Sequence, residues 1–301
     1  MNDLHLIDLD QSQTGYRHFI TSWLYRGDGS TYIVDTGPAN TAGDLIDTLR
    51  GLDVTRLDYI LLTHIHLDHA GAAGHVAEAF PDAKVVCWPK AATHLIDPAR
   101  LWAGSLQVLG ETAVMFGEPL PIDEHRLVHP DTLAAHGITW LHTPGHAPHH
   151  VSYVHGDILY VGEAAGMTCP TSTGALYLRP ATPPRFFLDV ALDSLDRLMA
   201  LDPRPERFVL AHYGAVADPS TFLDLARDQL VLWVDVLSGL RAEMGVEDWS
   251  AEFQSEALTA LSVADPLFAA FADLDADLQT REHEYFRNTL EGILGHLARE
   301  A

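Results

Sequence analysis

Four side chains that can bind a metal ion lie within six positions of one another, in the segment Thr-His-Ile-His-Leu-Asp-His at residues 63–69. These candidate ligands are His64, His66, Asp68 and His69. Imidazole and carboxylate groups together favour a borderline divalent cation such as zinc, without any need for cysteine. A strand-like run precedes the segment and small residues follow it. In such a strand-to-helix loop, the first two histidines can face one cation while Asp68 and His69 turn toward a second.

Four ligands cannot complete two metal sites. Three further candidate ligands are present, and each follows an apolar, strand-like run. His146 lies in Leu-His-Thr-Pro-Gly-His at residues 141–146, Glu163 follows the run 158–161, and His212 follows the run 207–210. Each run ends in a polar residue and then in glycine or small residues. Open α/β sheets build their binding sites beyond the ends of such strands. A single histidine after a strand is usually an ordinary core or surface residue, whereas this ordered combination predicts a metal centre.

The segment 63–69 fits in full the Thr-His-x-His-x-Asp-His signature of the metallo-β-lactamase superfamily, and Thr-Pro-Gly-His at residues 143–146 resembles the third-ligand loop of its glyoxalase II-like members. The resemblance covers roughly residues 4–215 and implies an α+β fold, the four-layer αββα sandwich. Carried over by position, it implies a first metal bound by His64, His66 and His146. It likewise implies a second metal bound by Asp68, His69 and His212.

Glu163 departs from the family pattern, which usually has aspartate after glycine as the bridging carboxylate. The longer side chain can still bridge two cations, but it can also change their spacing or favour another metal. We therefore expect two divalent metal ions, with zinc as the first expectation and iron or manganese as alternatives.

Composition excludes several classes of partner. The 301 residues contain 47% hydrophobic residues, which predicts an ordinary buried core. With 42 acidic and 18 basic residues, the formal net charge is −24, and such a chain repels the phosphate backbone of nucleic acids. We expect a small-molecule substrate and no nucleic-acid partner.

No run of about 18 uncharged apolar residues is present, and the first ten residues lack the basic and apolar regions of a signal peptide. The two cysteines, Cys87 and Cys169, have no spacing that indicates a disulfide framework. We therefore expect a cytoplasmic protein without a membrane partner.

Hydrophobic periodicity divides the chain into two parts, a metallo-β-lactamase-like domain at residues 1–217 and a helical extension at 218–301 that packs on it. Residues 89–130 lack clear periodicity and are interpreted as an insertion that covers the metal cleft or forms a homodimer contact. Strands are predicted at residues 4–9, 16–25, 30–34, 59–62, 84–88, 138–141, 151–154, 158–161 and 207–210. Helices are predicted at residues 42–49, 188–201, 218–244, 249–261 and 278–298.

Four residues outside the ligand set are candidates for supporting roles. Asp35 follows a predicted strand and either orients a ligand histidine or caps a turn. His150, Tyr177 and Arg179 lie in loops after metal-ligand candidates and are predicted to contact substrate; Arg179 in particular can clamp an anionic group. The alternatives are a loop-stabilising hydrogen bond for His150 and an ordinary surface position for Arg179.

The leading functional prediction is a metal-dependent hydrolase of a small ester-like substrate, such as a thioester or a lactone. Hydroxide formed from water on the metal ions would attack the carbonyl carbon, and Asp68 would orient the nucleophile or relay its proton. No Gly-x-Ser-x-Gly motif provides a serine nucleophile instead. The alternatives are a non-haem iron redox enzyme on the same fold, which Glu163 favours, and a metal-binding protein without catalysis.

Overall fold

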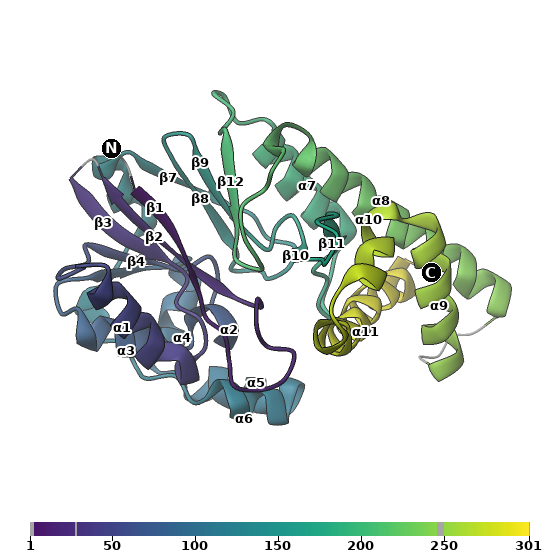
Figure 1. Ribbon diagram of the computed structural model, residues 1–301, viewed down its shortest axis with the longest axis horizontal. Helices are drawn as coiled ribbons and strands as arrows, with labels where there is room; N and C mark the ends of the chain where they lie inside the picture. Colours follow the sequence, from purple (N-terminus) through teal and green to yellow (C-terminus); the bar gives the residue numbers. More distant parts are fainter. Residues whose placement is uncertain (1–2, 28, 246–249, 301) are drawn as a thin grey trace.

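Two β-sheets face each other in the computed structural model, which describes residues 3–27, 29–245 and 250–300, and helices cover the outer side of each sheet (Figure 1). The first sheet has the strand order β1-β2-β3-β4-β5-β6. Its strands are β1 (Asp3–Asp8), β2 (Thr21–Gly27), β3 (Ser30–Val34), β4 (Tyr59–Leu61), β5 (Lys84–Val86) and β6 (Leu127–Val128). Pairing is antiparallel from β1 to β3 and parallel from β3 to β6.

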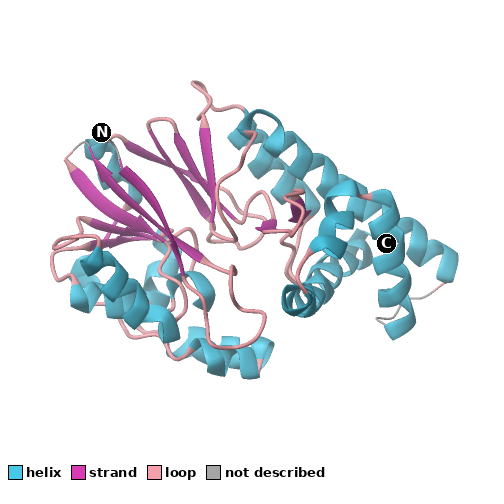
Figure 2. Ribbon diagram, viewed as in Figure 1, coloured by secondary structure: helices cyan, strands magenta, loops and turns pink. Residues whose placement is uncertain are grey.

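The second sheet has the order β12-β9-β8-β7, with a parallel pair between β12 and β9. Its strands are β7 (Ile138–His142), β8 (Val151–His155), β9 (Ile158–Gly162) and β12 (Arg207–Leu210). The short strands β10 (Met167–Cys169) and β11 (Tyr177–Arg179) pair separately and lie at the end of this sheet nearest the C-terminal helices (Figure 2).

The helices fall into two groups on the outer sides of the two sheets. The first group is α1 (Ala42–Gly51), α2 (Leu67–Ala70), α3 (Ala73–Ala79), α4 (Ala92–Ile96), α5 (Ala99–Leu109) and α6 (Glu111–Phe116). The second group is α7 (Leu188–Met199), α8 (Pro219–Met244), α9 (Ala251–Ala264), α10 (Pro266–Ala269) and α11 (Ala276–Glu300). Short 3₁₀ turns are η1 (Ala39–Thr41), η2 (Pro89–Ala91), η3 (Glu124–Arg126), η4 (Pro130–His136) and η5 (Ala270–Asp273).

Three apolar clusters form the core of the four-layer sandwich. One lies between the sheets, where Tyr32 and Tyr160 meet and their hydroxyls are 3.1 Å apart. The other two lie between each sheet and its helices. Because the strands in the middle layers are covered on both faces, they are nearly continuous apolar runs, as in β9. The predicted α+β sandwich is confirmed.

The C-terminal helices share one apolar cluster with the second sheet: Phe208 of β12 belongs to the same cluster as Trp233 of α8 and Phe286 of α11. Helix α11 also approaches the loop after β11 closely. A Cβ atom at Gly292 would collide with the carbonyl oxygen of Thr182, so only glycine allows this approach. Helices α8 to α11 therefore pack against the second sheet through a shared apolar interior.

Most predicted elements are present with boundaries shifted by a few residues. The strand predicted at 16–25 begins only at Thr21, because the chain turns before it and His18 has a left-handed φ of 48°. Residues 89–130, which showed no periodicity, contain three short helices and β6. The predicted helix at 249–261 includes residue 249, which lies outside the described part of the chain. Within residues 3–27, 29–245 and 250–300, no helix is both long and apolar enough to span a membrane.

Candidate metal centre

The seven predicted ligands come together at one end of the two facing sheets. His64 follows β4, and His66 is the residue before α2, which carries Asp68 and His69. His146, Glu163 and His212 follow β7, β9 and β12 respectively. All seven lie in loops or first helical turns just beyond strand ends, which is where the sequence predicted them to converge.

A first donor group consists of His64, His66, His146 and Glu163, whose ligand atoms lie within 4.8 Å of one another. His66 Nδ1 lies 3.0 Å from His64 Nε2 and 3.0 Å from His146 Nε2. The three imidazoles come from two sheets, and the sequence separation between His66 and His146 is 80 residues. Only the tertiary fold brings them together.

A second donor group consists of Asp68, His69 and His212, again within 4.8 Å of one another. His69 Nε2 lies 3.1 Å from His212 Nε2, and Asp68 Oδ2 lies 3.4 Å from His212 Nε2. His69 and His212 are fully buried, whereas 16% of the Asp68 side chain is exposed. Asp68 is therefore the ligand of this group that faces solvent.

Glu163 lies between the two groups. Its Oε2 atom is 3.0 Å from His146 Nε2, 3.2 Å from His64 Nε2 and 3.1 Å from His69 Nε2. Its Oε1 atom is 3.8 Å from His212 Nε2. One carboxylate thus contacts histidines of both groups, as a bridging ligand requires.

The spacing of the donor atoms fits metal coordination. Zinc–nitrogen bonds of about 2.0–2.1 Å in a tetrahedron separate neighbouring ligand nitrogens by about 3.3 Å. Neutral imidazole has one donor and one acceptor nitrogen, so three nitrogens that converge on one point cannot all satisfy one another by hydrogen bonds. A cation at that point satisfies every lone pair at once.

In four of the five ligand histidines, the ring nitrogen that faces away from the donor groups contacts an oxygen atom. His69 Nδ1 lies 2.9 Å from Asp35 Oδ2, and His64 Nδ1 lies 3.1 Å from Thr63 Oγ1. His212 Nδ1 lies 2.6 Å from the Phe19 carbonyl oxygen, and His146 Nδ1 lies 3.2 Å from that of Ala181. Metal-ligating histidines typically have such partners, which set the tautomer and the orientation of the ring.

Asp35 lies where a residue that orients a ligand histidine was predicted. It has a left-handed φ of 57° at the end of β3, a conformation that aspartate tolerates better than most residues. Its carboxylate accepts hydrogen bonds from the backbone N–H and the hydroxyl of Thr63 as well as contacting His69. The turn therefore fixes the Asp35 carboxylate in contact with both Thr63 and His69, the two ends of the ligand segment 63–69.

The charges in this region match a cation site. Burial by itself would raise the pKa of Asp68, but the charge of His69 lowers this pKa to about 2. Burial would also raise the pKa of Glu163, and His146 and His212 lower it well below its usual range. Burial lowers the pKa of His66 to about 3. Ionised carboxylates beside a neutral imidazole are the donor set that a divalent cation needs.

His150 is not among the residues that line the cavity beside the metal centre, and its contacts fit the alternative of a loop-stabilising hydrogen bond. It is fully buried, and its Nδ1 lies 2.9 Å from Thr143 Oγ1. Its Nε2 accepts a hydrogen bond of 3.0 Å from the backbone N–H of Glu163. A Cβ atom at Gly162, whose φ is +64°, would collide with this imidazole. His150 thus holds the strand end from which Glu163 projects.

Tyr177 and Arg179 are engaged in a second buried polar cluster, which we call the Arg179–Glu282 network and which consists of Tyr177, Arg179, Arg281, Glu282 and Thr289. Glu282 Oε2 accepts hydrogen bonds from the Tyr177 hydroxyl at 3.0 Å and from Arg179 Nε at 3.2 Å. Arg179 Nη1 also donates to Thr289 Oγ1 at 2.6 Å. Because its charge is already paired, Arg179 does not fit the predicted role of a clamp for a substrate anion.

A cavity of about 470 Å³ opens directly beside the donor groups, with His66, Asp68, His146 and Glu163 in its wall. His149, rather than its neighbour His150, also lines it; the two residues lie at a turn in which the backbone N–H of His150 donates to the carbonyl oxygen of Ala147 at 3.1 Å. Tyr285 of α11 is a second lining residue outside the predicted site residues. The adjacent histidines at 149–150 indicated a possible contact near His149, whereas nothing in the sequence distinguished Tyr285 from other helix residues.

Comparisons with known proteins agree with this geometry. The model of the metallo-beta-lactamase superfamily matches residues 15–212. The metallo-beta-lactamase fold-containing protein ST1585 of Sulfurisphaera tokodaii is 29% identical over 206 residues, which cover 65% of this chain and 74% of that protein. A hydroxyacylglutathione hydrolase of Aeromonas salmonicida is 31% identical over 183 residues, which cover 60% of this chain and 56% of that protein. The match thus spans little more than half the length of that relative.

Two solved structures share the fold over nearly the whole chain. ST1585 from Sulfolobus tokodaii, a crystal structure of an archaeal metallo-beta-lactamase superfamily protein, gives a TM-score of 0.67 at 22% identity, covering 99% of this chain and 98% of that chain. The metallo-beta-lactamase family protein TTHA1429 from Thermus thermophilus gives a TM-score of 0.61 at 20% identity, covering 99% and 93%. Since the family model covers well over half of the sequence and the ligand set is complete, the chain belongs to the metallo-beta-lactamase superfamily.

Proposed function

We propose that this protein is a metal-dependent hydrolase of a small ester-like substrate, a thioester, a lactone or a related acyl compound. The observation that carries the proposal is the pair of adjoining donor groups with Glu163 between them, open to a cavity of small-molecule size. The hydroxyacylglutathione hydrolases among the relatives, whose name describes thioester hydrolysis, support this class of reaction.

Each donor group would hold one divalent cation: His64, His66 and His146 would bind the first, Asp68, His69 and His212 would bind the second, and Glu163, which contacts histidines of both groups, would be a shared ligand. Cations so placed supply Lewis acidity and lower the pKa of a water molecule from about 15.7 toward about 7. Zinc is the first candidate, because imidazole and carboxylate ligands without sulfur suit it.

Asp68 is placed to transfer a proton between the attacking water and the leaving group. It lies at the boundary between the donor groups and the cavity, and its carboxylate is the part of the second group that solvent reaches. In the proposed reaction, the water oxygen forms a bond to the carbonyl carbon, Asp68 accepts the water proton, and the ester C–O or thioester C–S bond breaks. The leaving alcohol or thiol then takes up that proton.

Elemental analysis of the purified protein and hydrolysis assays on an ester, thioester and lactone panel test the proposal together. We expect two cations per chain and a fall of about 10²–10⁴-fold in kcat for Asp68→Asn. Asp82→Asn, a substitution at an exposed aspartate whose side chain is 70% accessible, serves as the control and should leave kcat unchanged.

Two results would contradict the proposal. An Asp68→Asn protein that keeps both cations and full activity would remove Asp68 from the mechanism. Stoichiometric iron together with oxygen consumption and no hydrolysis of any panel member would replace the hydrolase by a redox enzyme.

A further inference from the structure

The cavity beside the metal centre has mainly apolar walls away from the ligands. One wall is α5, whose eleven residues include none that is fully buried although Leu101, Val108 and Leu109 are apolar. These side chains border the cavity and leave their apolar surface there. The volume of about 470 Å³ lies within the range of about 300–1,000 Å³ that is typical of small-molecule pockets.

The opposite wall is α11 and the loop after β11. Tyr285 faces the cavity from α11, and the loop adds Ala181, Pro183 and Pro184. The tight contact at Gly292 and the Arg179–Glu282 network hold α11 against this loop. These contacts fix the position of α11 relative to the loop that completes this wall.

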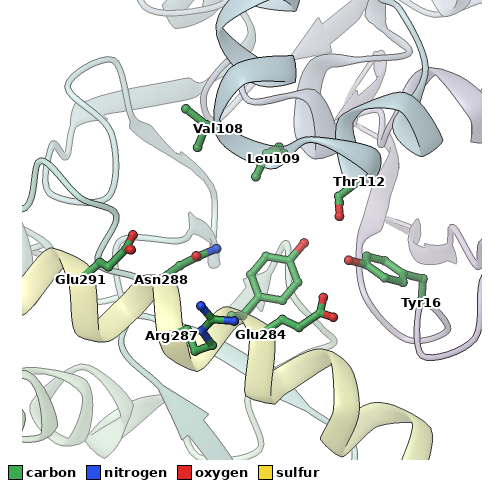
Figure 3. Close-up of a pocket in the computed structure, with 9 residues that line it drawn as sticks. Tyr16, Val108, Leu109, Thr112, Glu284, Arg287, Asn288 and Glu291 are labelled. Atoms are coloured by element: carbon green, nitrogen blue, oxygen red, sulfur yellow. The ribbon is translucent and has the colours of Figure 1, made fainter. Parts of the chain in front are cut away.

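The adjoining cavity of about 260 Å³ extends this space outward, since both cavities border on Val108, Leu109 and Tyr285. Figure 3 shows Val108 and Leu109 on one side of the outer cavity, facing the Glu284, Arg287 and Glu291 side chains of α11 on the other. The apolar surface thus runs from the metal ligands to a polar rim.

The charges of the cavity wall distinguish anionic substrates from uncharged ones. Arg100 and Arg179 both border the inner cavity, and the charge of Arg179 is paired with that of Glu282. The charges of Asp68 and Glu163 are matched by the proposed cations, whereas at the outer cavity Glu284 and Glu291 outnumber Arg287, and the chain has a net charge of −24. A dianionic group, such as a peptide thiol with two carboxylates, meets repulsion there, whereas an uncharged alkyl chain does not.

We infer that the cavity selects uncharged acyl substrates, with the scissile carbonyl at the metal ligands and an apolar acyl chain along Leu101, Val108 and Leu109 of α5. This inference rests on the proposed function, because it names the substrate class of that same site. Hydrolysis breaks the C–O or C–S bond, adds the water oxygen to the acyl carbon, transfers a proton to the leaving group and releases a fatty acid. Each buried methylene strengthens binding about fourfold.

Acyl thioesters with one common leaving group test the chain-length dependence. The series runs from acetyl through butyryl and hexanoyl to octanoyl, and a succinyl thioester provides a charged acyl group. We expect kcat/KM to rise about fourfold per methylene until the cavity is filled, and the succinyl compound to fall below butyryl by at least about tenfold.

Gly104 allows the cavity to be filled without a cost in folding. It borders the cavity from α5, and a Cβ atom there meets nothing within 4 Å. Gly104→Leu also removes an unfavourable glycine from a helix. We expect this variant to lose the gain between hexanoyl and octanoyl, a relative fall of about tenfold or more. Gly239→Leu is the matched control, since Gly239 is a helical glycine with the same open surroundings, outside both cavities.

Val108 tests the charge preference. It borders both cavities and is 74% exposed, so Val108→Lys should fold normally, favour the succinyl compound several-fold and disfavour octanoyl. Val114→Lys is the matched control, because Val114 is 64% exposed on α6 and borders neither cavity.

Binding to the metal-free protein separates the failure of this inference from the failure of the proposed function. Calorimetric titration should show octanamide binding at least about tenfold more tightly than acetamide, and Gly104→Leu should abolish the difference. Equal rates across the acyl series, or equal affinities for the two amides, would overturn the inference and leave the hydrolase intact. Tight octanamide binding without hydrolysis of any thioester by the metal-loaded protein would support the apolar site and contradict the proposed function.

Discussion

Two buried clusters of polar residues lie close together in this protein, and their chemistry differs. In the Arg179–Glu282 network, each charge has an opposite partner and the donors find acceptors within the chain. In the metal centre, imidazole nitrogens face one another and carboxylate oxygens at about 3 Å, so that several lone pairs converge without enough donors to satisfy them. A cluster that is complete by itself stabilises the fold, whereas an incomplete one needs a cation.

The largest difference between the clusters should appear in Glu163→Gln. This change removes the charge that contacts both donor groups. Loss of an outer partner of a ligand typically costs about 10–100-fold in metal affinity or activity, and loss of a ligand itself should cost more. We therefore expect a fall of more than about 100-fold in hydrolysis and the loss of one cation by elemental analysis. The free energy of unfolding of the metal-free protein should fall by less than in Glu282→Gln, because the histidines around Glu163 can lose their protons, whereas the arginines around Glu282 stay charged.

Glu163→Asp is the matched variant for this comparison, since it keeps the charge and shortens the side chain. It should retain both cations with altered activity. A metal-free Glu163→Gln protein that unfolds as easily as a variant of the Arg179–Glu282 network would erase the distinction between the two clusters.

Glu282→Gln should show the opposite behaviour. It leaves Arg179 and Arg281 buried without their shared partner, and breaking a buried ion pair from one side costs about 3–5 kcal/mol. Denaturant unfolding should show this loss, whereas the number of cations per folded chain should stay that of the wild type. Glu256→Gln, at an exposed position of α9, is the control and should change neither quantity.

Asp35→Asn tests a residue that belongs to the metal centre without lying in either donor group. The substitution weakens the acceptor that holds His69 Nδ1 at 2.9 Å. We expect metal affinity to fall about 10–100-fold, measured by competition with a chromophoric chelator. Asp44→Asn, at an exposed position of α1, should have no effect on affinity. An unchanged affinity for Asp35→Asn would limit Asp35 to a role in the turn.

The smallest expected effect is the pH dependence of the Arg179–Glu282 network. Burial by itself would raise the pKa of Glu282, but Arg179 and Arg281 lower it below its ordinary value. Near the ordinary value, the unfolded state therefore binds more protons than the folded state. The stabilisation is present above the ordinary pKa and is lost as pH falls through the lower folded value. The difference in unfolding free energy between wild type and Glu282→Gln should accordingly shrink below about pH 4, and a constant difference would contradict this assignment.

The ligand set could be predicted because each ligand has a local signature. His64 and His66 lie in one short segment, and His146, Glu163 and His212 each follow an apolar strand that is recognisable by its composition. The fold class followed from the same strands and from the resemblance that they carry. Metal ligands that are recognised by their neighbours in sequence can therefore be predicted from the sequence.

The helices of residues 89–130 and the substrate side of the site could not be predicted in this way. Helix α5 has no fully buried residue, since Leu101 and Leu109 are only partly covered by the core and also border the cavity. His150 and His149 are adjacent, and only the geometry of the loop decides that the first supports Glu163 while the second faces the cavity. Arg179 is indistinguishable in sequence from an arginine that is free to bind an anion.

The sequence by itself determined which residue types can hold metal ions and the strand ends from which they project. Only the tertiary structure decided what surrounds them. The partner of Arg179 is Glu282, 103 residues away, and this contact withdraws a positive charge from the cavity. Such contacts depend on how α11 packs against β11, because the attraction between two charges requires proximity in space, and no pattern of neighbouring residues specifies that proximity.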